Sequence, residues 1–197
     1  MPRAGLTPGV VTAEAASLVD ERGFDALSLA ALAKRLGVAT PSLYKHVDGW
    51  DGLVREVSLL SVSELAERLR SAAVGRSGAE GVRAVFDAYR RYALEHPGRY
   101  ASIQRAPAAS DTEAHTHYAR PVEVIAAVLR GFSIPEGRMV HTIRALRSAV
   151  HGFVDLETRG GFGLPEDVDE SFAVLVEGFV RALDGWSGRA TGEEQRG

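Results

Sequence analysis

The side chains best suited to bind a ligand through charge or hydrogen bonds are concentrated between positions 28 and 46. They are short hydroxyls, one proline, one aromatic ring, one lysine and one histidine: Ser28, Thr40, Pro41, Ser42, Tyr44, Lys45 and His46. Such groups suit phosphate oxygens, base edges and thymine methyls. Residues 28–47 also hold three cations, Lys34, Arg35 and Lys45, and no acid, a local balance of +3. This composition permits contact with DNA but does not require it.

Two short helices joined at a glycine are expected to position these groups. Ser28 is a suitable N-cap for the helix LAALAKRL, and Gly37 can end it with positive φ. Thr40 is expected to cap a third helix, PSLYKHV, with Pro41 at its first position. Val38 and Leu43 are spaced to pack the two helices together. A helix-turn-helix that places its second helix in the major groove has this form, but so has an ordinary helical hairpin. The polar, acid-free third helix favours the DNA-binding alternative.

The whole chain is expected to be all-α, because its apolar residues recur at three- and four-residue steps. The fold class is an N-terminal three-helix bundle with a helix-turn-helix plus a C-terminal helical domain for ligand binding and dimerisation. Asp51 and Asp111 are expected to cap later helices, and GRSG (75–78) to form a loop. Further helices are expected over about 79–95, 99–106 and 135–159, and the last should end near 186. The predicted domains are 1–50, which binds DNA, and 51–187, followed by a disordered tail, 188–197.

Overall composition bounds the class of protein. The 197 residues carry a net charge of −3, which by itself argues against nucleic acid, but only one face need meet DNA. Cysteine is absent, which excludes disulfides and thiol chemistry. We see no signal peptide and no apolar run long enough for a bilayer, so we expect a cytoplasmic protein with no membrane partner.

Nothing in the sequence indicates an enzyme. His115 and His117 are the nearest approach to a metal site, but they lie about 200° apart on a helix and face away from each other. No Ser, His and Asp set has a recognisable context, and RGGFG (159–163) lacks the strand that a phosphate loop requires. We therefore expect no catalytic residue, no metal and no cofactor.

The segment from Val11 to Val57 resembles the DNA-binding domain of the TetR family, most specifically in the run G-V-x-x-P-S-L-Y-x-H. The resemblance implies that Tyr44 and His46 contact phosphate, and that Thr40, Ser42 and Lys45 lie nearest the bases. It also implies that Ser28 both caps its helix and contacts phosphate. One position departs from the family pattern: Trp50 stands where a lysine is usual, so we expect a phosphate contact to be lost and Trp50 to pack.

The last two long helices carry wide apolar stripes that predict a four-helix bundle across a two-fold axis. The predicted interface residues are Ile143, Val150, Phe153, Phe172, Leu175, Phe179 and Leu183. The segment 144–157 also resembles a TetR subgroup with a Trp, His, Gly signature. His151 and Gly152 fit this signature, whereas Arg147 stands where the tryptophan is expected.

This resemblance implies a small-molecule pocket among the central helices. The candidates are Phe86, Tyr89, Tyr92, Tyr100, Ile103, Tyr118, Val122, Ile125, Arg144, Arg147 and His151. For each of them an ordinary core position is the competing interpretation, because a helical aromatic stripe more often forms core than a binding site.

We therefore expect a homodimeric transcriptional repressor that binds double-stranded DNA and leaves a palindromic operator when a small-molecule effector binds. Two alternatives stay open. One is an interaction module that shares the fold, and the polar residues of 28–47 speak against it. The other is a repressor without an effector, its pocket filled by side chains, and nothing in the sequence excludes that form.

Overall fold

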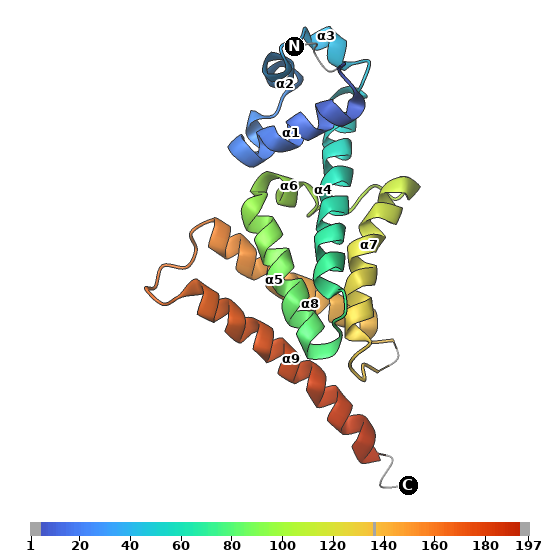
Figure 1. Cartoon of the computed structure of the whole chain (residues 1–197), viewed down its shortest axis with the longest axis vertical. Coiled ribbons are helices and arrows are strands. Elements are labelled where there is room, and N and C mark those ends of the chain that lie inside the picture. The colour runs from blue at the N-terminus through green and yellow to red at the C-terminus, as the bar shows by residue number, and fades with distance from the viewer. Residues whose placement is uncertain (1–4, 136, 194–197) are drawn as a thin grey trace. The chain divides into compact units, whose positions relative to one another are not determined.

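A computed structural model describes residues 5–135 and 137–193, with side chains described up to residue 185. All regular structure in these ranges is helical, as predicted. The elements are α1 (Pro8–Arg22), the 3₁₀ turn η1 (Phe24–Ala26), α2 (Leu29–Leu36), α3 (Thr40–Leu43), α4 (Gly49–Ala73), α5 (Gly78–Glu95), α6 (Pro97–Ser102), α7 (Thr112–Leu129), α8 (Met139–Thr158) and α9 (Val168–Glu193) (Figure 1).

The chain forms two compact units. The first contains residues up to Glu64 together with Glu95–Tyr118, and the second contains Leu65–Leu94 and the residues from Ala119 onward. Both α4 and α7 therefore contribute residues to each unit. The domain boundary that we predicted at residue 50 separates the residues expected to bind DNA from the rest of the chain. That functional division stays a prediction. The packing itself places the first half of α4 and all of α6 with the N-terminal helices.

The core of the first unit lies between α1, α2, α3 and the first half of α4. Val11, Leu32, Leu43, Leu53 and Val57 are completely buried there. These residues recur on one face of each helix, and burying such stripes against one another is what stabilises short helices.

Local caps define the helix ends in the first unit. The Thr7 hydroxyl accepts from the Val10 N–H. The Ser28 hydroxyl accepts from the Ala31 N–H, as predicted. Two predicted caps are wrong. Ala39, not Thr40, precedes α3, because its extended backbone places its carbonyl to accept from the Ser42 N–H.

The fourth helix also begins earlier than predicted. The Gly52 N–H donates to the Asp48 carbonyl, so Asp51 already lies inside the first turn of α4 instead of capping it. An acidic residue in the first turn is still favoured by the helix dipole.

Helix α6 lies directly against α1 (Figure 1). A Cβ at Gly98 would stand 2.1 Å from the Val19 carbonyl oxygen, so only glycine permits this contact. Asp20 accepts from the Arg99 backbone N–H at 2.8 Å, and Arg99 Nη1 donates to Glu64 at 3.0 Å. Arg99 thus joins α6 to both α1 and α4. The helix spans 97–102 instead of the predicted 99–106.

The start of α7 is fastened to α4. Asp111 caps α7 as predicted, accepting from the Ala114 N–H, and it also accepts two hydrogen bonds from Arg55. The Arg55 pair holds the pKa of the Asp111 carboxyl well below its ordinary range, with help from the Ala114 bond. One turn further on, His117 Nδ1 lies 2.8 Å from the Ser63 hydroxyl oxygen.

The second unit is built from the end of α4 with α5, most of α7, α8 and α9. Arg90 of α5 is only 12% exposed and lies over the rings of Phe153 and Phe172. It pairs with Glu157 of α8 at 2.5 Å and with Asp169 of α9 at 2.7 Å. One guanidinium therefore holds three helices together.

Helix boundaries in the second unit were predicted less well. Helix α5 matches its prediction, but α8 begins at Met139 and not near 135, because residues 133–135, 137 and 138 are not helical. Helix α9 continues to Glu193, past the predicted end near 186. The predicted disordered tail, 188–197, thus overlaps this helix, and residues 194–197 lie outside the described residues. Over the part searched, no helix is long and apolar enough to cross a membrane.

Candidate nucleic-acid interface

The turn between α2 and α3 has the geometry predicted for a helix-turn-helix. Gly37 adopts φ +67° in the left-handed region that favours glycine, and its N–H donates back to α2. The Val38 N–H donates to the Ala33 carbonyl at 3.0 Å, and Leu43 is completely buried. Together these contacts fix the direction of α3 relative to α2.

The predicted contact residues lie next to one another on α3 and the turn that follows it. Pro41 and Lys45 are exposed, and Tyr44 is 60% exposed. Thr40, Ser42 and His46 are half-buried.

The predicted third helix was too long. It ends at Leu43, so Tyr44, Lys45 and His46 belong to a turn, although the His46 N–H still donates to the Leu43 carbonyl. Val47 is buried in the core and closes this turn. Residues 40–46 thus form one helical turn followed by a turn anchored at Leu43 and Val47, and we call the exposed side chains of residues 28–47 the predicted reading surface.

Ser28 can fulfil both roles that the resemblance implies. Its hydroxyl oxygen accepts the Ala31 N–H at 3.0 Å, which leaves the hydroxyl proton available. The residue is exposed. A phosphate oxygen could accept that proton while the cap stays intact.

Arg35 does not contribute a free charge to this surface. Its Nε donates to Glu14 at 2.7 Å, and its two terminal nitrogens donate to Glu21 at 2.6 and 2.7 Å. These bonds, the Glu21 bonds above all, raise the pKa of Arg35 and lower that of Glu21. The count of +3 for residues 28–47 therefore overstates the unpaired charge of this surface, because it leaves out the acids of α1 that pair with Arg35.

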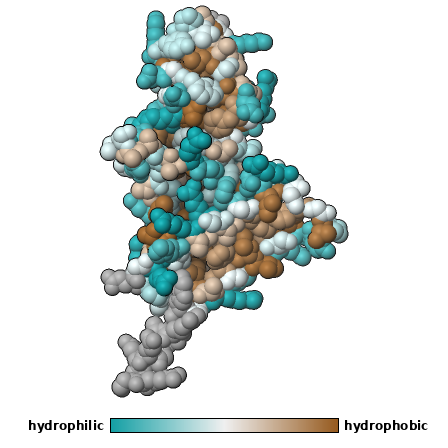
Figure 2. Space-filling view, turned by 180° about the vertical axis from the view of Figure 1, so that it is seen from behind, coloured by the Kyte–Doolittle hydropathy of each residue, from teal (hydrophilic) through white to brown (hydrophobic). Residues whose placement is uncertain are grey.

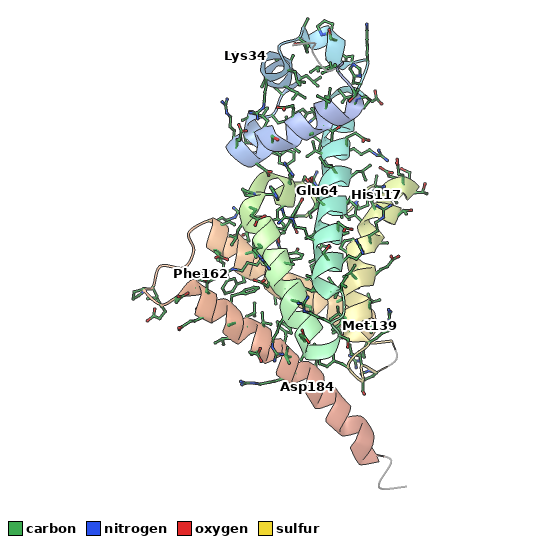
Figure 3. The ribbon with its side chains drawn as sticks, in the orientation of Figure 1. Lys34, Glu64, His117, Met139, Phe162 and Asp184 are labelled. Atoms are coloured by element: carbon green, nitrogen blue, oxygen red, sulfur yellow. The ribbon has the colours of Figure 1, made fainter. Side chains whose placement is uncertain are left out.

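Lys34 and Lys45 differ from Arg35. Both are exposed, and among the residues that the structure describes neither forms an ion pair (Figure 3 labels Lys34 on α2). The unpaired positive charge of this surface thus comes from lysine.

We predicted that Trp50 packs against the protein, but much of its side chain is exposed to solvent. It lies in the first turn of α4 and is 41% exposed. Asp48 and Asp51 beside it are also exposed. This corner of the unit therefore carries an aromatic ring between two acids where the family pattern has a cation.

The predicted dimer residues lie mainly inside the chain. Ile143, Val150, Phe172 and Leu183 are buried by the chain's own residues, and Phe153, Leu175 and Phe179 are half-buried. A partner is not needed to cover the first four.

Single apolar side chains of α8 and α9 are uncovered. Val140 and Leu156 of α8 are 56% and 50% exposed, and Val174 of α9 is 73% exposed, while Arg144 and Arg147 of α8 are exposed as well. Gly152 and Gly178 have nothing within 4 Å of a Cβ position. Figure 2 shows a broad white-to-brown area over α8 and α9.

The pocket candidates are divided between the two units. Tyr100, Ile103 and Tyr118 belong to the first unit, and the other eight belong to the second. Within the second unit Phe86, Tyr89 and Tyr92 are buried and Ile125 and His151 are half-buried, whereas Val122, Arg144 and Arg147 are exposed. The Arg68 guanidinium lies over the Tyr92 ring, with its Cζ atom 5.6 Å from the ring centre.

A groove of about 650 Å³ lies between α5, α8 and α9, and the sequence did not predict it. No pocket candidate lines it. Its walls carry paired charges, with Arg83 bound to Glu177, Arg90 to Glu157 and Arg91 to Asp87. Phe172 and Val176 form its apolar floor. Arginines beside the apolar stripe of α5 were the signal in the sequence, but the partners of Arg90 and Arg83 lie on α8 and α9, more than sixty residues away.

The first unit contains a helix-turn-helix whose core is buried and whose tyrosine and lysine are exposed, and the chain also forms a second helical unit. This combination defines a DNA-binding regulator of two parts. Residues 11–57 match the profile of bacterial regulatory proteins of the tetR family, and residues 82–179 match the tetracyclin repressor-like C-terminal domain. The chain belongs to the TetR family. The narrower Trp, His, Gly subgroup stays a prediction.

Relatives and solved structures agree with this assignment. The chain is 33% identical over 178 residues to the uncharacterized HTH-type transcriptional regulator Rv0681 of Mycobacterium tuberculosis, covering 90% of this chain and 80% of that protein. Such relatives are transcriptional regulators and not enzymes.

Two solved structures show the same fold. A Rhodococcus protein of unknown function has a TM-score of 0.78 at 23% identity, over 93% of this chain and 98% of that one. Streptomyces coelicolor ActR in complex with (S)-DNPA has a TM-score of 0.64 at 20% identity, over 93% and 100%.

Proposed function

We propose that this protein is a cytoplasmic, homodimeric repressor that binds a palindromic operator and releases it when a small-molecule effector occupies the second unit. The observation that carries the DNA-binding part is the exposure of Tyr44 and of the unpaired Lys45 on a helix-turn-helix with a buried core, with a second unpaired lysine, Lys34, on α2. Tyr44 and His46 position the protein on phosphate, while Thr40, Ser42 and Lys45 read bases.

Dimerisation is proposed through α8 and α9. Exposed Leu156 lies one turn from Gly152 on the same side of α8, and exposed Val174 lies one turn from Gly178 on the same side of α9, which suits close packing against a second copy. Two reading surfaces would then lie about 34–36 Å apart, one helical turn of DNA. Val174→Asp should convert the dimer to a monomer in sedimentation, and a dimer that survives it would contradict this interface.

The effector part of the proposal is supported by the fold and by the ligand-bound form of ActR. The aromatic side chains Phe86, Tyr89 and Tyr92 make the second unit suited to an aromatic or apolar effector. A hundredfold loss of DNA affinity requires about 2.7 kcal/mol of coupling, which lies within the usual allosteric range. By linkage, operator DNA must weaken effector binding by the same factor.

The first experiment is selection of bound duplexes from a random pool by the purified protein at controlled salt. An enriched inverted repeat supports a specific dimeric reader. Tyr44→Ala should then weaken binding to all sequences, whereas Lys45→Ala should also relax base preference. A folded dimer that enriches no sequence would favour the interaction module instead.

An operator that no compound releases would favour a repressor without an effector. Titrating a candidate compound with and without operator separates these cases, because equal affinities exclude coupling.

A further inference from the structure

Lysine is confined to the reading surface. The chain has 23 basic residues, and only Lys34 and Lys45 among them are lysines, so the other 21 are arginines. Both lysines lie within residues 28–47, one on α2 and one on the turn after α3. Every side-chain amine of the protein is therefore placed where we propose that DNA binds.

The two amines are also the accessible cations of that surface. Both lysines are exposed and, in the described part of the chain, have no carboxylate partner. Arg35, between them in sequence, is bound by Glu14 and Glu21. An arginine keeps its proton throughout the physiological range and is a poor nucleophile, whereas a lysine can lose its proton and react.

We propose that Lys34 and Lys45 form a modification site for Nε-acylation by an activated acyl donor, an acyl phosphate or an acyl thioester, and that acylation releases the protein from DNA. This inference rests on the proposed DNA-binding function. It adds a covalent control that needs no effector in the second unit.

The reaction balances without an oxidant or a reductant. The ammonium group first loses a proton to solvent, and the amine lone pair attacks the acyl carbonyl carbon. A C–N amide bond forms as the C–O bond to phosphate, or the C–S bond of the thioester, breaks. Phosphate or thiolate leaves with the electron pair, and the nitrogen gives up its second proton.

The electrostatic consequence follows from the ion pairs. Each acylation removes one positive charge. Since Glu14 and Glu21 already neutralise Arg35, acylation of both lysines leaves residues 28–47 with no unpaired lysine or arginine. In a dimer the loss is doubled. If each lysine meets one phosphate, the salt slope of binding falls by about one for every lysine acylated.

The test uses the full chain and two donors in separate arms, acetyl phosphate and acetyl-CoA. Peptide mass spectrometry measures acetyl occupancy at each lysine, and fluorescence anisotropy measures affinity for a random-sequence duplex at low salt. We expect both lysines to acquire acetyl groups in at least one arm, which also identifies the donor class. Affinity should fall roughly a hundredfold as occupancy rises, with a shallower salt slope.

The matched control is the double variant Lys34→Arg, Lys45→Arg. It keeps both charges and has no side-chain amine, so donor treatment should leave its affinity at the value measured for the same variant before treatment. Lys34→Gln, Lys45→Gln should bind as weakly as acetylated protein without any donor.

The outcomes separate this inference from the proposed function. Donor treatment that leaves both lysines unmodified overturns the inference, as does full acetylation without loss of affinity. Equal loss of binding by treated wild type and treated arginine variant also overturns it. Failure of the untreated wild type to bind duplex would instead overturn the proposed function, and it is seen before any donor is added.

Discussion

The first unit leaves Lys34 and Lys45 unpaired on its reading surface, whereas the second unit pairs each arginine that lines its groove. Arg83, Arg90 and Arg91 all meet carboxylates there. The first unit also uses arginines for support, since Arg55 and Arg99 join its helices. Paired arginine thus supports the scaffold in both units, and unpaired lysine distinguishes the surface that we propose meets DNA.

The difference has a physical reason. The guanidinium group is planar and presents several donors, so it can join carboxylates from two or three helices at once. A lysine on an exposed turn keeps its charge available for a phosphate and releases counterions on binding. The following predictions test this division of roles, beginning with the largest expected effect.

Gly98→Ala should destabilise the first unit by about 3 kcal/mol, because its Cβ would stand 2.1 Å from the Val19 carbonyl oxygen. Helix α6 would have to leave α1 and break the Arg99 contact with Asp20. Urea unfolding measures the change. Gly9→Ala is the control, since nothing lies within 4 Å of its Cβ position. Equal stability of the two variants would show that α6 is not held by this contact.

Arg90→Ala should destabilise the second unit by about 2–3 kcal/mol, because it leaves Glu157 half-buried without its partner. It also removes the guanidinium from the rings of Phe153 and Phe172. Thermal unfolding is the measurement. Arg91→Ala breaks an exposed pair on the same helix and should cost less than about 0.5 kcal/mol. Similar losses in both variants would contradict a supporting role specific to Arg90.

Asp111→Asn should make stability less dependent on acidic pH. Arg55 lowers the pKa of Asp111 in the folded protein, so the pair stabilises above the ordinary carboxyl pKa of about 3.9. That stabilisation is lost as pH falls through the lower folded value, where Asp111 becomes protonated. The urea midpoint of the wild type should therefore exceed that of the variant at about pH 7, and the difference should shrink steadily as the pH falls below about 4. A constant difference would exclude the ion pair, because asparagine still caps α7.

Glu14→Gln with Glu21→Gln should strengthen DNA binding modestly, by roughly three- to tenfold at low salt, because it frees Arg35 and removes two acids. The salt slope should steepen by about one per subunit. Anisotropy with a random-sequence duplex measures both quantities. Glu67→Gln removes an acid paired with Arg70 on α4, in the second unit, and should leave affinity unchanged. Unchanged affinity in the double variant would show that Arg35 does not face DNA.

Local chemistry made the helix-turn-helix predictable. The Ser28 cap, the positive φ of Gly37 and the buried positions of Val11 and Leu43 all depend on residues within a few positions of one another. Helix caps and helical periodicity depend on residues only a few positions apart, so they could be predicted from the sequence. It also placed the Asp111 cap and the extent of α5 correctly.

Helix ends and surface charge were harder to predict. The caps of α3 and α4 depend on backbone angles at Ala39 and Gly49 that composition does not specify. In the second unit, apolar stripes on α8 and α9 were visible, but periodicity cannot say whether the chain itself or a partner covers them. The structure buries Ile143 and Val150 inside the chain and exposes Val140 and Leu156.

The all-helical class and the family could be predicted from the sequence, because both follow from residue types at short spacings, whereas the segment that contacts DNA stays a prediction. Which cations remain unpaired depends on the tertiary structure. Glu14 and Glu21 neutralise Arg35 from another helix, and Asp111 does the same for Arg55 across 56 positions. Such pairs form between residues that packing brings together, so local charge counts could not reveal them.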